Sequence, residues 1–200
     1  MEFPLKLQFK LIALAPQLWV HDARGNLLGY VKQKLLKLKE SVTVYADEAQ
    51  TKPIYTMNAN RILDINARYT LANTAGQTVA TLDRSIWRSM KALFTNSITH
   101  TINLDEKPVF VVKDEKPSRV FWNGLLGNLP VVNLITGYFL NPTYTMRREG
   151  TGEEILRLVK QPALFESAFT VELVGNISPR EQEAALLSLM MIVLLERSRG

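Results

Sequence analysis

The side chains most often used in catalysis and metal binding are scarce in this sequence. His21 and His100 are its only histidines, and it contains no cysteine. A His-rich metal site, a thiolate metal site, a disulfide and a cysteine nucleophile are therefore excluded, and a histidine-assisted nucleophile has no marked partner. The sequence also lacks the phosphate-binding glycine loops and the Gly-x-Ser-x-Gly turn of hydrolases. We expect a protein that is not an enzyme, with no catalytic residues, no cofactor and no metal ion.

Basic residues that follow hairpin turns offer a binding chemistry. The candidates for contact with anionic lipid are Lys32, Lys34, Lys37, Lys39, Arg84, Arg88 and Lys160. If the hairpins repeat one unit, these side chains gather at one side of the fold and can meet phosphate groups. The alternative is a set of solvated, outward-facing positions. The formal net charge of +5 favours anionic partners in general, but we expect no nucleic acid among them.

The segment from Val120 to Met146 contains no charged residue. Its glycines, prolines and asparagines argue against a membrane-spanning helix. It can serve as an apolar lid on the mouth of the fold, as a loop that dips into a membrane, or as an oligomer contact. Its candidate contacts for a protein partner are Phe121, Trp122, Leu125 and Leu126.

The elements that must position these residues begin with a C-terminal helix. Ser178 is a suitable N-cap, Pro179 suits the first helical position, and Glu181 completes a capping box, so we predict a helix over residues 179–196. From Ala184 to Leu195 only Ser188 is polar. A helix that is apolar on every side must be enclosed, and this one is too short to favour a membrane span.

The rest of the chain has the pattern of an antiparallel β-protein. Glycine turns end at Gly25, Gly76 and Gly152, and each is followed by a segment in which apolar and polar residues alternate. Ser41–Tyr45 and Phe169–Leu173 alternate in the same way. We predict a mainly β fold, in which about ten to twelve strands form a closed antiparallel barrel around the central apolar helix.

Size and the N-terminal residues set the expected organisation. With 200 residues, 46% of them hydrophobic, the chain can bury a large core, and we expect a single domain over residues 1–200. The apolar run near the N-terminus covers only Leu11–Ala15, which is too short for a signal peptide. We expect a cytoplasmic protein that can attach peripherally to a membrane.

Several of these segments resemble a known family. The turn at Gly25 and the motifs Tyr30–Lys39, Val44–Asp47, Ala67–Tyr69, Asn141–Tyr144 and Leu186–Arg197 are similar to those of bacterial LURP-one-related proteins. The resemblance covers residues 18–197 and implies a β-barrel around a central C-terminal helix. It also implies a place near the tubby C-terminal-like superfamily, which contains the phospholipid scramblases.

The resemblance implies a fold more strongly than an activity. Tubby domains bind phosphoinositides and scramblases act on membrane lipids, but neither the tubby lipid-binding residues nor the Cys-rich acylation segment of scramblases matches positions here. Transfer of either function is analogy from the fold. We predict a non-enzymatic, ligand-binding barrel whose ligands are anionic phospholipid headgroups at a membrane surface. The alternative is a protein-interaction or scaffolding module that uses the apolar segment 120–140.

Overall fold

A computed structural model describes residues 1–10, 17–32, 41–62, 66–87, 97–114, 143–161 and 167–197. Twelve strands and one helix lie in these ranges. The elements are β1 (Leu5–Lys10), β2 (Gln17–His21), β3 (Leu27–Lys32), β4 (Ser41–Tyr45), β5 (Pro53–Ile62), β6 (Asn66–Asn73), β7 (Thr78–Trp87), β8 (Ser97–Leu104), β9 (Lys107–Asp114), β10 (Thr143–Arg148), β11 (Glu154–Gln161), β12 (Ser167–Leu173) and α3 (Pro179–Arg197).

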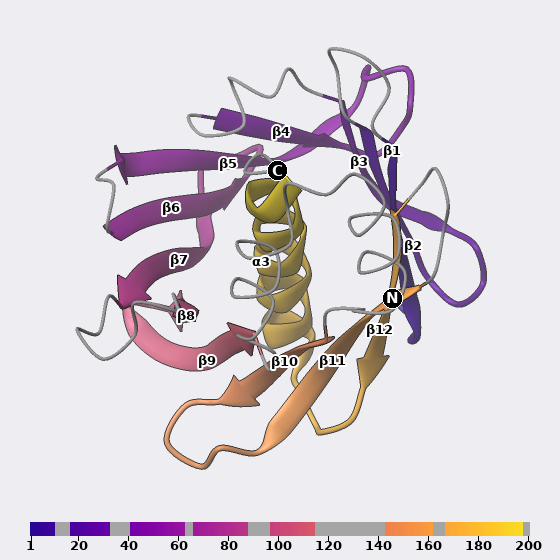
Figure 1. Ribbon diagram of the computed structural model, residues 1–200. Coiled ribbons are helices and arrows are strands. Elements are labelled where there is room, and N and C mark those ends of the chain that lie inside the picture. The colour runs from indigo at the N-terminus through magenta and orange to yellow at the C-terminus, as the bar shows by residue number, and fades with distance from the viewer. Residues whose placement is uncertain are drawn as a thin grey trace, which may run out of the picture.

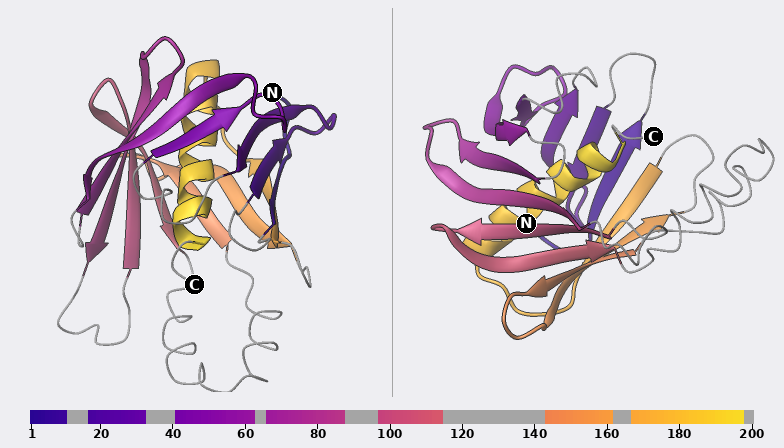
Figure 2. Two further views of the ribbon diagram at one scale, coloured as in Figure 1. Left: turned by 90° about the horizontal axis from the view of Figure 1, so that it is seen from above. Right: turned by 60° about the vertical axis from the view of Figure 1, so that its left-hand side comes forward.

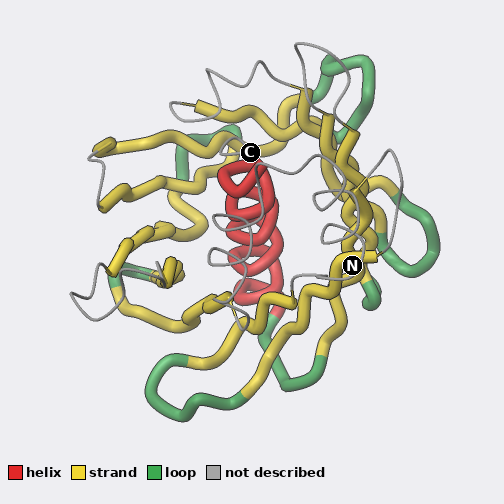
Figure 3. Tube along the Cα trace, viewed as in Figure 1, coloured by secondary structure: helices red, strands yellow, loops and turns green. Residues whose placement is uncertain are grey.

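The twelve strands form a closed antiparallel barrel (Figures 1 and 3). Each strand pairs with the next one along the chain, and β1 pairs with β12 to close the sheet. The predicted architecture is confirmed, including the number of strands. Glycines at the predicted turns have the left-handed backbone that tight hairpins require, with φ of 82° at Gly25 and 77° at Gly76.

The helix α3 runs through the barrel, as seen from two further directions in Figure 2. Every residue from Ala184 to Leu195 is at most 8% exposed, so the wall covers all sides of this stretch. Its closest neighbours are β6, β7 and β8. The helix ends at Arg197, one residue beyond the predicted end. Within the described residues, no helix is long and apolar enough to cross a membrane.

Apolar and polar residues alternate along the strands, and the apolar ones point inward to complete the core around the helix. In β1, for example, Leu5, Leu7 and Phe9 are at most 2% exposed, while Lys6 between them is exposed. In β3 the inward position is taken by Gly29. A Cβ atom there would lie 2.9 Å from Cγ1 of Val44 and 3.4 Å from Cε of Met190. The glycine therefore makes room for the helix side chains close to the wall.

Polar contacts fix the start of α3 to the barrel. The capping box forms as predicted, since the Ser178 amide donates to the Glu181 carboxylate at 2.8 Å and the Glu181 amide donates to Ser178 Oγ at 3.3 Å. The Arg180 guanidinium donates two hydrogen bonds, of 2.6 and 2.8 Å, to Asp105 in the turn between β8 and β9. The first helical turn is thus tied to the barrel wall.

A second set of contacts reaches other strands. Arg148 at the end of β10 donates to Glu181 at 2.7 Å, and its guanidinium lies 5.3 Å from the centre of the Phe110 ring. Burial, together with a hydrogen bond to Glu183, raises the pKa of Tyr55 in β5 to about 12. Strands on different sides of the barrel therefore hold the first two turns of the helix.

The up-and-down order of the strands separates two ends of the barrel. At one end, which we call the turn rim, consecutive strands are joined by short described turns, at residues 22–26, 74–77, 105–106 and 149–153. The connection at residues 46–52 starts from the same end but returns along the outer wall, where Gln50 donates to the Lys32 carbonyl at 3.3 Å. The strands β1, β3, β5, β7, β9 and β11 finish at the other end, where the strand that follows each of them begins. We call it the helix-end rim, because α3 starts at the turn rim and finishes there (Figure 2).

The enclosure of α3 generates a first prediction. Leu189 is 1% exposed, so Leu189→Asp places an unpaired charge in the core at a cost of several kcal/mol, comparable with the whole stability of a typical domain. We expect the variant to be insoluble or unfolded by circular dichroism. The matched control is Val174→Asp, because Val174 is 53% exposed and should tolerate the same substitution. A soluble Leu189→Asp variant with unchanged melting contradicts the enclosed helix.

Candidate functional site

The structure describes the side chains of two of the predicted anion-binding residues, Lys32 and Arg84. Lys32 is exposed at the end of β3. For Lys160 it describes the backbone in β11, opposite Phe169 of β12. The remaining predicted residues lie outside the described ranges, namely Lys34, Lys37, Lys39 and Arg88, together with Phe121, Trp122, Leu125 and Leu126.

The barrel order nevertheless brings the flanks of these segments together. β3 ends at Lys32, just before residues 33–40, and β7 ends just before residues 88–96. β9 and β10 flank residues 115–142. All of these strand ends lie at the helix-end rim, and the backbone of Lys160 is one residue from the same end of β11. The predicted basic and apolar segments therefore leave the barrel from a single rim.

Arg84 does not face outward, which was the alternative position considered for the basic residues. In register it lies opposite Ala67 of β6 and opposite His100 of β8, which are 7% and 2% exposed. Its Nε atom is buried and has no hydrogen-bond partner. Arg84 therefore points into the barrel, on the same side of β7 as the buried Ala80 and Leu82.

Arg84, His100 and Tyr69 form a polar cluster in a described interior that is apolar apart from these residues and Ser188 of α3. Arg84 hydrogen-bonds with Tyr69, and this contact lowers a Tyr69 pKa that burial raises more strongly. Burial is the main cause, and the positive charge of Arg84 the second, of a His100 pKa that falls to about 3. His100 Nε2 is buried without a partner. The ring is thus neutral near pH 7 and retains an unused polar atom.

Comparison with known proteins identifies the family of this chain. A family model described as LURP-one-related matches residues 28–193. The chain belongs to the LURP-one-related family. No curated protein and no solved structure was found to match it. The matched residues run from β3 into α3, so this LURP-one-related protein carries Lys32 and the Arg84 cluster inside the family region.

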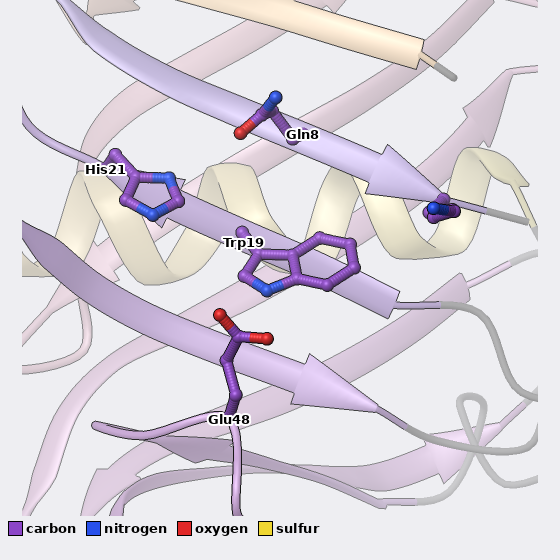
Figure 4. A pocket seen from close by; sticks show the side chains of 5 residues that line it. Gln8, Trp19, His21 and Glu48 are labelled. Atoms are coloured by element: carbon purple, nitrogen blue, oxygen red, sulfur yellow. The ribbon is translucent and has the colours of Figure 1, made fainter. Parts of the chain in front are cut away.

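A shallow hollow of about 300 Å³ lies on the outer wall and was not expected from the sequence. It is lined by Gln8, Lys10, Trp19, His21 and Glu48. The Glu48 carboxylate points toward the Trp19 indole (Figure 4). That ring packs on Tyr30 with centroids 5.3 Å apart, so the aromatic floor is held in place. An indole beside hydrogen-bonding groups suits a small polar ligand. Strand alternation alone could not reveal it, because Glu48 comes from a turn.

A second hollow of about 150 Å³ near the turn rim is bordered by Lys113, Arg147 and Arg148. Its arginines already contact acidic groups, with Arg147 3.9 Å from Glu154 and Arg148 3.7 Å from Glu153. These ion pairs offset part of the positive field that an anion would meet. The basic charge here is therefore largely used by the fold of the β10–β11 hairpin.

The buried histidine predicts an acid-sensitive fold. An unfolded histidine binds a proton near its ordinary pKa of 6.5, whereas folded His100 does so only at about 3. Between these values protons favour the unfolded chain, so stability is complete above the higher pKa and falls as the pH drops below it. From about pH 7 to about pH 5 the loss from this residue is about 2 kcal/mol, measurable by urea unfolding.

The two histidines of the chain supply the control. His100→Gln should flatten this part of the pH profile, while His21→Gln on the outer wall should leave it unchanged. An equal slope in wild type and His100→Gln would show that His100 is not the group responsible.

Proposed function

We propose that this LURP-one-related barrel is a non-enzymatic protein that binds anionic phospholipid headgroups at a membrane surface through its helix-end rim. One observation carries the proposal. The strand ends that flank the Lys-rich residues 33–40, residues 88–96 and residues 115–142, which are uncharged from residue 120 onward, all lie at that rim. In the sequence these segments are far apart, and only the closed barrel relates them.

Electrostatics gives the first part of the attraction. The chain carries a formal net charge of +5, and Lys32 is exposed at the rim. Lys34, Lys37 and Lys39 follow it within seven positions, and Arg88 follows the end of β7. Each Lys or Arg near an anionic bilayer contributes about 1 kcal/mol. Several such residues leaving the barrel at one end favour a defined orientation toward the membrane.

Apolar residues give the second part. Most of the uncharged segment lies in the connection between β9 and β10, so this connection departs from the same rim as the lysines. Peripheral proteins combine basic residues with apolar ones that enter the interface between headgroups and acyl chains. In this proposal the segment acts as a membrane-dipping loop, and the protein is cytoplasmic and attaches reversibly to the membrane.

A relation to tubby C-terminal-like barrels and phospholipid scramblases belongs to the same proposal. The closed barrel around a helix is the architecture that this relation implies, and members of both groups act on or bind membrane lipids. This support is an analogy at the level of the fold. The alternative function is a protein-interaction or scaffolding module, in which Phe121, Trp122, Leu125 and Leu126 contact a protein partner.

Charge reversal at the helix-end rim tests the proposal. Lys32→Glu combined with Lys34→Glu should remove at least about 2 kcal/mol of binding to anionic liposomes, which is about a thirtyfold loss. Stability should change by less than about 0.5 kcal/mol, as is usual for solvated surface residues. The measurement is co-sedimentation with phosphatidylserine-containing liposomes, repeated over a range of salt concentrations.

The matched control is Arg24→Glu combined with Lys107→Glu, two exposed residues at the turn rim that change the net charge equally. The 19-residue helix between the rims is roughly 28 Å long, several times the Debye length of roughly 8 Å, so this control should bind almost as well as wild type. Equal losses in both double variants would contradict binding through one rim. If wild-type protein shows no salt-sensitive liposome binding, the protein-interaction function is favoured instead.

A further inference from the structure

The interior of the barrel contains a positive charge that the described fold does not neutralise. Arg84 occupies an inward position of β7, and its buried Nε–H has no acceptor. Within the described ranges, no carboxylate forms an ion pair with it, although other arginines on the outer wall do so, such as Arg68 with Asp83 and Arg157 with Glu154. Its hydrogen-bond partner Tyr69 is a neutral phenol.

The residue opposite Arg84 has an unused polar atom as well. His100 is 2% exposed, and its Nε2 atom has no hydrogen-bond partner. Buried polar groups in native proteins are almost always hydrogen-bonded, so two unused atoms on directly opposed residues call for an explanation. The surrounding wall is apolar, with Leu82 and Val112 fully buried beside the pair. In such a low-dielectric environment an unpaired polar atom destabilises the fold, and a hydrogen bond that a ligand makes with it is strong.

We propose that Arg84, His100 and Tyr69 form an interior binding site for a small oxyanion, a phosphate or carboxylate group that enters from the helix-end rim. A guanidinium presents N–H donors in a fork that matches the oxygens of such a group. The neutral imidazole donates from Nε2 in the tautomer that carries its proton there. The Tyr69 hydroxyl accepts from Arg84 and can donate its own proton.

The cluster lies nearer to the helix-end rim than to the turn rim. Arg84 lies three residues before the end of β7, and His100 lies three residues after the start of β8. At roughly 3.3 Å per residue, both are about 10 Å below the helix-end rim. The turn rim lies farther from the cluster, and the first turns of the helix are tied there to Asp105 and Arg148. This inference does not depend on lipid binding, since a free anion would satisfy the same donors.

The two histidines make the test specific. The full-length protein, labelled with ¹⁵N in its histidines, is titrated with inorganic phosphate while sodium chloride keeps the ionic strength constant. We expect the His100 ring signals to shift and saturate and the His21 signals to stay in place. In Arg84→Gln the apparent affinity should fall at least tenfold. The control Arg157→Gln, which removes an outer-wall guanidinium, should titrate like wild type.

A second probe identifies the source of the anion. Dihexanoyl phosphatidic acid below its micelle concentration carries the same phosphate group on a lipid. Saturation by inorganic phosphate supports a site for free anions, and saturation by the lipid alone supports a site for a headgroup phosphate. If neither probe moves the His100 signals, or if Arg84→Gln responds like wild type, the site does not exist. Should Arg84→Gln fail to fold, Arg84→Lys keeps the charge but loses the fork and should still weaken saturation.

Discussion

From Ala184 to Leu195, α3 has no side that can face water without exposing apolar side chains. A one-sided sheet could cover only half of such a helix, so the strands must surround it, and closure between β1 and β12 completes the cover. The same closure removes the exposed sheet edges that would otherwise invite aggregation. The wall then has to be apolar inside and polar outside along every strand, which is the alternation seen from Leu5 to Phe9.

Closure also decides where function can be placed. An up-and-down barrel sends its connections alternately to two ends, and this chain uses the two ends differently. The turn rim is built from short hairpins and from charged contacts that hold the helix start, such as Arg180 with Asp105 and Arg148 with Glu181. Glu181, which accepts from Arg148, also accepts from the Ser178 amide in the capping box at the start of the helix. The contacts described for the start of α3 all lie away from the helix-end rim, so a binding function at that rim leaves the anchor of the helix in place.

Most of the fold could be predicted because its signals are local. The capping box at Ser178 and Glu181 and the turns at Gly25 and Gly76 specify their own geometry. The interior site was harder to predict from the sequence, because it depends on which residues lie opposite one another on neighbouring strands. Arg84 shares its side of β7 with the inward Ala80 and Leu82, but from the sequence we considered it only as a lipid contact or an outward-facing residue, and its opposition to His100 needs the register of β8. The hollow at Trp19 and Glu48 combines a strand with a distant turn, and no sequence spacing relates them.

The two kinds of positive charge at the helix-end rim act by different physics. An exposed lysine such as Lys32 acts through its field, which salt screens within roughly a Debye length, so its contribution depends on ionic strength more than on position. Arg84 lies below the rim among buried apolar side chains, where screening is weak and directed hydrogen bonds are strong. High salt should therefore release a ligand held by the outer lysines and leave one held by Arg84. A barrel closed around an apolar helix can carry both, because its rim meets water while its interior, a few residues deeper, does not.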